Sequence, residues 1–273
     1  MTPLGKGRQN RPEVRPAGAN WPEMNCAPHS PSPASIPTAS LGRVVASAAS
    51  GLPPSVGVGA AVKEVMRLEG RIDLLVNNAG FGVAPAGAEE SSIEQARSIF
   101  DTNFFGVVRM TRAVVPHMRG QGRGRIINIG SVLGFLPMPY GALYAATKHA
   151  LEGYSESLDH ELRGKGIRVS VIEPAYTRTQ FEANILEPDA KLNEYREVRL
   201  AVGRRLSEIM AAADPPSVVA EAVLQAASAG RPRLRYTAGP LASRLRLLRR
   251  FAPTALMDSG IRRDLRLDAQ ENS

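Results

Sequence analysis

Tyr144 and Lys148 are four residues apart, and Ser131 precedes the tyrosine by 13 residues. In a helix, a spacing of four places both side chains on one face. A tyrosine hydroxyl ordinarily titrates at about pH 10, and a neighbouring ammonium favours the phenolate, so we expect Lys148 to lower the pKa of Tyr144. Tyr144 can then act as an acid or a base near neutral pH, and Ser131 can hydrogen-bond the same substrate oxygen. These residues favour proton transfer to or from an alcohol oxygen.

None of these groups can carry a hydride, so oxidation or reduction at that oxygen requires a redox cofactor. The single cysteine, Cys26, excludes a disulfide framework and a cysteine-ligated metal, and the four histidines are scattered. We therefore expect no metal site. No apolar run is long enough to span a membrane, and no secretory signal is evident, so we expect a cytoplasmic protein.

The segments between these residues alternate between apolar strands and amphipathic helices. The sequence predicts strands at 72–76, 125–129, 167–172 and 234–236, and helices at 60–68, 92–118, 144–163 and after Asp214. This alternation indicates an α/β fold with a doubly wound, Rossmann-like parallel sheet. Asn77, Ser131 and Pro174 each follow the end of a strand. Because ligands bind beyond the carboxyl ends of such strands, we expect the three segments to line one cleft.

The two ends of the chain differ from its middle. Residues 1–55 hold 10 of the 21 prolines and show almost no hydrophobic periodicity, which predicts a disordered Pro-rich segment before a folded domain at 56–273. The C-terminal part is basic and has leucines at helical spacing. We favour a helix that docks on the domain or on another subunit, and the alternative is a helix at a membrane surface. The net charge of +8 lies mostly at the ends, so we expect no nucleic-acid partner.

Five segments together resemble the short-chain dehydrogenases/reductases, in particular their steroid- and retinol-type members. These segments are Leu75-Val-Asn-Asn-Ala-Gly80, Asp101-Thr-Asn-Phe-Phe-Gly106, Ile129-Gly-Ser131, Tyr144-Ala-Ala-Thr-Lys148 and Glu173-Pro-Ala-Tyr-Thr-Arg-Thr179. A Tyr-x-x-x-Lys pair alone is common by chance, whereas the combination is specific. The family glycine after Pro174 is Ala175 in this chain. The resemblance covers residues 57–268, most of the predicted domain.

The resemblance implies an oxidoreductase that interconverts a secondary alcohol and a carbonyl with NAD or NADP. Tyr144 would exchange the proton, Lys148 would lower its pKa and hold the nicotinamide ribose, and Ser131 would orient the substrate oxygen. Asn103 would fix a helix irregularity and a water in a proton relay. The residues implied to bind the cofactor are Asn77, Ala79, Gly80, Tyr144, Lys148, Pro174, Thr177 and Thr179. Asn77 has an alternative role as a turn former and Thr179 as a helix N-cap.

One part of the family pattern is missing from the sequence. The family opens with a strand, a turn of the Thr-Gly-x-x-x-Gly-x-Gly kind and a helix that receives the cofactor pyrophosphate, but no such turn precedes residue 60. NAD and NADP therefore cannot be distinguished, and Leu41–Val45 is interpreted as a remnant of the third strand. A parallel sheet without its first strands exposes apolar surface. We expect a marginally stable or aggregation-prone protein, or one stabilised by a partner.

Two other classes of function remain open. The missing turn allows a catalytically silent binding or scaffold protein of the same fold, and the C-terminal arginines allow weak peripheral contact with a membrane. For the enzyme, the resemblance implies a small-molecule alcohol or ketone as substrate, with residues 181–213 as a lid. Family members usually pair through two long helices, here 92–118 and 144–163, which implies a homodimer or homotetramer.

Overall fold

The short apolar runs of the sequence form one parallel sheet. In the computed structural model, which describes residues 44–47 and 56–267, the strand order is β1-β2-β3-β4-β5. The strands are β1 (Val44–Ser47), β2 (Leu74–Asn77), β3 (Gly124–Ile129), β4 (Ile167–Pro174) and β5 (Arg235–Ala238). Every neighbouring pair is parallel. Their carboxyl ends therefore meet at one edge, as the sequence predicted.

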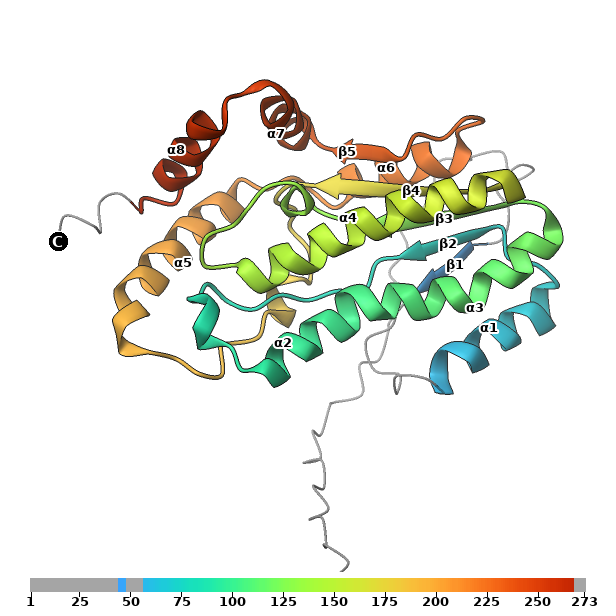
Figure 1. Ribbon diagram of the computed structural model, residues 1–273, viewed down its shortest axis with the longest axis horizontal. Helices are drawn as coiled ribbons and strands as arrows, with labels where there is room; N and C mark the ends of the chain where they lie inside the picture. Colours follow the sequence, from blue (N-terminus) through green and yellow to red (C-terminus); the bar gives the residue numbers. More distant parts are fainter. Residues whose placement is uncertain (1–43, 48–55, 268–273) are drawn as a thin grey trace, which may run out of the picture. The chain divides into compact units, whose positions relative to one another are not determined.

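Helices pack on both faces of this sheet (Figure 1). The helices are α1 (Val56–Glu69), α2 (Ile93–Phe100), α3 (Gly106–Gln121), α4 (Ala142–Leu162), α5 (Arg196–Ala211), α6 (Ser217–Ser228), α7 (Pro240–Phe251) and α8 (Thr254–Asp264). One face is covered by α1, α3 and α4, and the other by α6. The α/β class and the doubly wound, Rossmann-like sheet predicted from the sequence are confirmed.

Successive strand residues point to opposite faces, and this alternation builds two cores. Leu75 and Ile126 are fully buried beneath α3 and α4. Their neighbours Leu74 and Ile127 are buried on the opposite face, against Ala226 of α6. Strands β2 and β3 are therefore apolar on both sides, which is why these parts of the sequence are continuous apolar runs rather than alternating ones.

The long helix predicted at 92–118 is not one regular helix. Helix α2 ends at Phe100, a π-helical segment covers Asp101–Phe105, and α3 then continues to Gln121. The wide turn carries Asn103, whose buried side chain leaves the helix axis to contact the loop after β2. π-Helical turns are rare and are found mostly at functional sites. Sequence periodicity did not reveal this turn.

Strand β1 lies within the segment that the sequence predicts to be disordered, and the rest of that segment lies outside the described residues. β1 pairs directly with β2. By the family resemblance, β2 would correspond to the fourth family strand. The usual strand order, 3-2-1-4-5-6, places the first strand beside the fourth. Of the residues interpreted as a remnant of the third strand, Val44 and Val45 therefore lie at the position of a first strand, and residues 41–43 lie outside the described residues.

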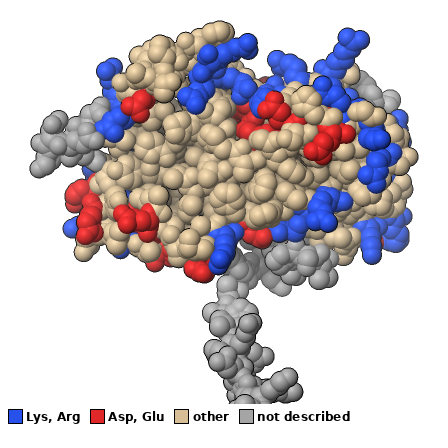
Figure 2. All heavy atoms as spheres, viewed as in Figure 1, with Lys and Arg blue, Asp and Glu red and all other residues tan. Residues whose placement is uncertain are grey.

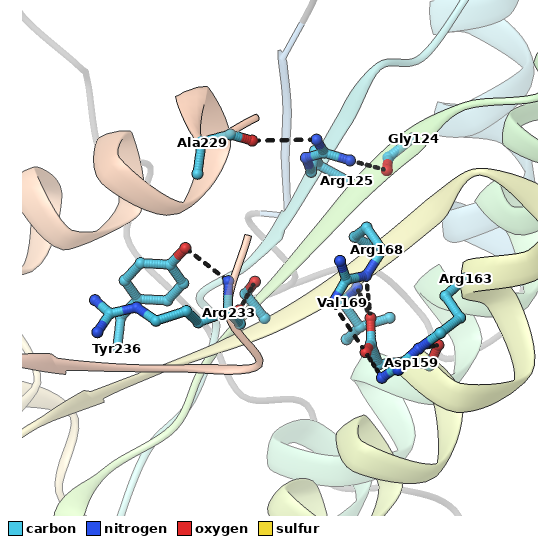
Figure 3. Close-up of polar contacts among 10 residues, drawn as sticks. Gly124, Arg125, Asp159, Arg163, Arg168, Val169, Ala229, Arg233 and Tyr236 are labelled. Carbon is cyan, nitrogen blue, oxygen red and sulfur yellow. Dashed lines mark hydrogen bonds and ion pairs between the residues drawn. The ribbon is translucent and has the colours of Figure 1, made fainter. Parts of the chain in front are cut away.

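A buried carboxylate holds the end of α4 against the start of β4 (Figure 3). Asp159 accepts hydrogen bonds from the backbone N–H of Val169 at 3.0 Å and from Nε of Arg168 at 2.9 Å. Its second oxygen accepts a bond from Nη2 of Arg163 at 2.6 Å. Asp159 is fully buried, so these bonds supply the partners that a buried charge requires. They set the position of α4, which carries Tyr144 and Lys148.

Candidate active site

Two loops and one helix converge at the carboxyl edge of the sheet. Gly80 lies in the loop after β2, Ser131 directly follows β3, and Tyr144 and Lys148 lie on the first turns of α4. Nζ of Lys148 donates a hydrogen bond of 2.9 Å to the carbonyl of Ile129, the last residue of β3. This bond draws the lysine toward the Ser131 loop.

Ser131 and Tyr144 contact each other across this edge. The Ser131 side chain lies close enough to the Tyr144 hydroxyl to lower the pKa of that group, and Nζ of Lys148 lies 5.6 Å from the centre of the Tyr144 ring. Ser131 also accepts a bond of 3.1 Å from the backbone N–H of Leu133, which orients its side chain. The predicted serine, tyrosine and lysine therefore share one site.

Asn103 connects the π-helical turn to this site. Its side-chain oxygen accepts a bond from the N–H of Phe81 at 3.0 Å, and its amide donates to the carbonyl of Phe81 at 2.8 Å. The amide also contacts Oγ1 of Thr147 at 3.2 Å, and Thr147 donates to the carbonyl of Tyr144. Asn103 thus holds the β2 loop against the start of α4. Sequence analysis missed Thr147, although its place between the tyrosine and the lysine was visible.

A close approach explains the glycine after β2. A Cβ atom at Gly80 would lie 3.1 Å from the side-chain oxygen of Asn103 and 3.9 Å from Nζ of Lys148. A side chain at this position would therefore press on Asn103 and contact Lys148. Gly80, Asn103 and Lys148 form one contiguous surface, with Ala79 directly before Gly80 in the same loop.

The electrostatics of Tyr144 differ from the sequence-based expectation. Burial raises the pKa of Tyr144 above its ordinary value, and the hydrogen bond from Ser131 opposes this shift only in part. Burial also lowers the pKa of Lys148 to about 8, against the opposing charge of Glu152. A lowered pKa at Tyr144 was expected, but its pKa is raised in this structure because desolvation outweighs the hydrogen bond from Ser131. Tyr144 is protonated at neutral pH here.

A buried carboxylate pair lies beneath the Ser131 loop. Glu173 is fully buried and Glu152 is 7% exposed. A Cβ atom at Gly134 would lie 2.8 Å from Cγ of Glu152, so the loop wraps closely around this side chain. Burial and the charge of Glu152 raise the pKa of Glu173 above its usual range, while Arg246 opposes the shift. Sequence analysis did not single out this pair, although Glu152 lies one helical turn after Lys148.

Arginines from two later elements pair with these acids. Nε of Arg235, on β5, lies 2.9 Å from Oε2 of Glu152, and Arg246, on α7, forms an ion pair with Glu173. Nη2 of Arg235 also lies 2.8 Å from Glu156. The C-terminal part of the domain is thus tied to the underside of the site.

The remaining predicted residues have different surroundings. Asn77 ends β2, and its amide donates to the side-chain oxygen of Asn128 at 2.8 Å, within the interior behind the edge. Pro174 ends β4 at the shared edge. The backbone of Thr177 pairs with Asp214. Thr179 is exposed and its hydroxyl accepts the N–H of Phe181 at 3.2 Å. The structure does not bring Asn77, Thr177 and Thr179 into contact with the tyrosine and lysine.

The predicted lid begins directly over the tyrosine. The ring of Phe181 packs edge-on against that of Tyr144, with centres 5.5 Å apart. Leu186 then pairs with the loop after β2: its N–H donates to the carbonyl of Gly82 at 2.9 Å, and its carbonyl accepts the N–H of Ala84 at 2.8 Å. A narrow cleft beside Tyr144 is lined by residues of two segments, 83–91 and 140–144, among them Val83 and Tyr140. This cleft leads to the tyrosine from the outside.

Comparison with known proteins agrees with this architecture. The family model for short chain dehydrogenase matches residues 51–190, half of the chain. This chain belongs to the short-chain dehydrogenase family. No helix in the described ranges has the length and apolar character needed to cross a bilayer.

Several members of the short-chain dehydrogenase family are similar in sequence. An uncharacterized oxidoreductase of Schizosaccharomyces pombe is 40% identical over 172 residues, which cover 62% of this chain and 71% of that protein. The 3-ketodihydrosphingosine reductase of Bacteroides thetaiotaomicron is 36% identical over 190 residues, 68% of this chain and 70% of that protein. Human retinol dehydrogenase 8 is 36% identical over 179 residues, 62% of this chain and 56% of that protein.

Solved structures of the family have the same fold. A short-chain dehydrogenase from Streptomyces avermitilis has a TM-score of 0.63 and 28% identity, and the match covers 80% of this chain and 77% of that one. A short-chain dehydrogenase/reductase from Burkholderia phymatum, solved with NAD, has a TM-score of 0.59 and 28% identity over 70% of this chain and 69% of that one. A serine dehydrogenase complexed with NADP+ has a TM-score of 0.54 and 32% identity, with coverage of 67% and 72%.

Proposed function

We propose that this protein interconverts a secondary alcohol and a carbonyl, with a nicotinamide dinucleotide as the hydride carrier. The observation that carries the proposal is the shared site of Ser131, Tyr144 and Lys148 at the carboxyl edge of the sheet. Family membership supports the same chemistry, since solved relatives contain NAD or NADP. The proposed cofactor is NAD, NADP or both.

The described residues fit one end of such a cofactor. Gly80 lies close to Asn103 and Lys148 because it has no side chain, and the lysine ammonium can donate to ribose hydroxyls. Ala79 and Gly80 would lie along the cofactor, and Pro174 would contact its nicotinamide from the end of β4. Residues 48–55, which follow β1, lie outside the described part of the chain.

Residues of this chain supply the proton and hold the substrate oxygen. When bound, the dinucleotide supplies or accepts the hydride. Tyr144, protonated at neutral pH, donates its hydroxyl proton to the carbonyl oxygen during reduction. Ser131 donates a hydrogen bond to the same oxygen and stabilises the charge that forms on it. The Lys148 ammonium stabilises the phenolate left on Tyr144. Asn103 positions the loop after β2, including Gly80, beside Lys148.

The substrate would enter through the cleft beside Tyr144. Val83 lines this cleft, Phe181 packs on Tyr144, and Leu186 pairs with the loop after β2. Apolar side chains in these positions favour an apolar alcohol or ketone.

Titration of the purified chain with NADH and NADPH, followed by the fluorescence of the reduced cofactor, tests the proposal. We expect saturable binding that is weakened in Lys148→Ala and kept in the matched exposed control Lys165→Ala. An absence of binding at millimolar cofactor would contradict the proposal and favour the second candidate, a silent scaffold of the same fold. That candidate is favoured by one feature of the sequence, the missing Gly-rich turn.

From the family resemblance we also propose that this chain forms a homodimer or a homotetramer. A surface groove on α2 supports this, because its lining includes Ile93, Phe100 and Phe105. Ile93 is 63% exposed and Phe105 is 48% exposed. Exposed apolar side chains grouped in this way are typical of subunit contacts. Sedimentation velocity of Phe105→Glu should show smaller particles than the wild type.

A further inference from the structure

Helix α7 contacts the rest of the domain through one side only. Ala242 is fully buried beside Val132 and Leu136, and Leu245 packs on the same cluster. One residue further along, Arg246 pairs with Glu173. Positions 242, 245 and 246 fall on one side of a helix. This side accounts for the docking of α7 on the domain.

The opposite side of α7 is apolar and has no partner among the described residues. Phe251 is 71% exposed, Leu247 is 61% exposed and Leu248 is 49% exposed, and Leu241 is 41% exposed at the start of the helix. Single exposed leucines are common on protein surfaces. On a helix of 12 residues, these four large apolar side chains all face away from the docked side, and grouped exposed apolar side chains mark sites of interaction.

Arginines lie among and beside these apolar side chains: Arg244 is on the outer side of α7, Arg250 is at its flank, and Arg249 is at the exposed end of the docked side. Arg244, Arg249 and Arg250 are exposed, and α7 contains no acidic residue. Within the described ranges, no carboxylate forms an ion pair with any of the three. The Arg250 guanidinium lies 5.5 Å from the centre of the Phe251 ring. In Figure 2, basic side chains lie along the upper margin of the molecule, where Figure 1 draws α7.

We propose that the outer side of α7 binds the surface of a membrane that contains anionic lipids. A helix lying in the interface buries apolar side chains at the boundary between headgroups and acyl chains, while its cations contact the headgroups. Anionic lipid surfaces attract such cations at close range. The arrangement of Leu247, Phe251 and the three arginines meets both requirements. The proposal is independent of the catalytic function proposed above.

A second copy of the chain fits the outer side of α7 less well. In a two-fold contact the same surface meets itself. Arg244, Arg249 and Arg250 of each copy would then face the arginines of the other, and like charges across an interface oppose association. The helix itself offers no acid to compensate. An anionic lipid surface pairs with these cations instead.

Co-sedimentation of the full chain with lipid vesicles tests the proposal. One set of vesicles contains phosphatidylcholine alone and the other also contains phosphatidylserine. We expect binding to the second set that weakens as salt is added. Arg249→Gln/Arg250→Gln should reduce the partition coefficient by roughly five-fold for each arginine, and Leu247→Ser/Phe251→Ser should also reduce it. Both pairs are exposed, so their melting temperatures should match that of the wild type.

The controls are matched in exposure and residue type. Leu68→Ser removes a side chain on α1 that is also 61% exposed, and Arg119→Gln removes an exposed cation at the end of α3. Neither control should change vesicle binding. The proposal is overturned by equal binding to both vesicle sets, by an equal loss in the controls, or by loss of a lipid-free oligomer in Leu247→Ser/Phe251→Ser. That last result would identify a second copy as the occupant.

Discussion

Arg246 on α7 forms an ion pair with Glu173, the residue directly before Pro174 at the carboxyl end of β4. The pair links the C-terminal helix to the strand that ends at the candidate site. Glu173 is fully buried, whereas the side chain of Arg246 is 36% exposed. Glu173 therefore bears most of the desolvation cost, which explains why its pKa is raised despite the neighbouring cation.

The raised pKa of Glu173 predicts how stability changes with pH. A raised pKa means that the folded protein holds this proton more strongly than the unfolded chain does. Its contribution to stability is complete below the ordinary carboxyl pKa and is lost as the pH rises through the raised value. Glu173→Gln stays neutral, so it should match the wild type at about pH 5 and exceed its free energy of unfolding by ~1 kcal/mol or more in alkaline solution.

Urea unfolding at both pH values measures this difference. Glu156→Gln is the matched control, since Glu156 pairs with Arg235 in the same cluster but its side chain is 50% exposed. The control should show no gain at alkaline pH. A Glu173→Gln protein that is less stable than the wild type at both pH values would show that the ion pair with Arg246 dominates.

Tyr144→Phe removes the proposed proton donor and leaves the ring in contact with Phe181. We expect kcat for carbonyl reduction to fall by about 100-fold or more, with the cofactor dissociation constant unchanged. Tyr140→Phe, in the wall of the same cleft, should keep most of the activity. Steady-state kinetics and cofactor fluorescence measure the two quantities separately, and a Tyr144→Phe rate close to that of the wild type would refute the assignment.

The pH dependence of reduction should report Lys148. Its pKa is lowered to about 8, so the ammonium loses its charge as the pH rises through that value, while Tyr144 keeps its proton. The phenolate that forms during proton donation then lacks its stabilising cation. We expect kcat/KM for reduction to be level below about pH 7 and to decline above pH 8.

Lys148→Arg distinguishes this cause from others, because a guanidinium keeps its charge through the whole range. In a variant that retains activity, the alkaline decline should move to higher pH. An unchanged decline would assign it to another group.

Gly80→Ala tests the close approach after β2. The new Cβ would lie 3.1 Å from the Asn103 oxygen, which is tighter than ordinary contact, so Asn103 must shift. We expect weaker cofactor binding and a lower kcat, since misplacement of reacting groups is costly. Gly120→Ala, on α3 with open space around it, should leave both unchanged. If Gly80→Ala and Gly120→Ala changed cofactor binding and kcat equally, the close approach at position 80 would not explain the effect.

Asp159→Asn tests the contact between α4 and β4 shown in Figure 3. The change removes the charge that pairs with Arg163 and Arg168 in the interior. We expect a loss of about 2 kcal/mol in the free energy of unfolding, because breaking a buried pair leaves groups without partners. Asp101→Asn breaks the half-exposed pair with Arg109 and should cost less than ~1 kcal/mol. Urea denaturation compares the two, and similar losses would contradict the argument.

The strands and the reacting residues were predictable from local patterns. Short apolar runs predicted β2, β3 and β4 within a few residues, because a strand buried on both faces needs apolar side chains on both. The spacing of four residues predicted that Tyr144 and Lys148 share one face of a helix. The position of Ser131 after a strand predicted that it lies at the same edge of the sheet. These features depend on neighbours along the chain, so the sequence alone determined them.

The electrostatics and the long-range contacts required the folded chain. The pKa of Tyr144 depends on how far the fold buries its hydroxyl away from water. The distance in sequence between Tyr144 and Lys148 carries no information about that burial. The π-helical turn at Asn103 depends on the backbone of Phe81 being close by. The partners of Glu173 and Glu152 come from β5 and α7, more than 60 residues away. Desolvation and pairing of this kind arise between segments that are distant in the chain, so only the tertiary structure decided them.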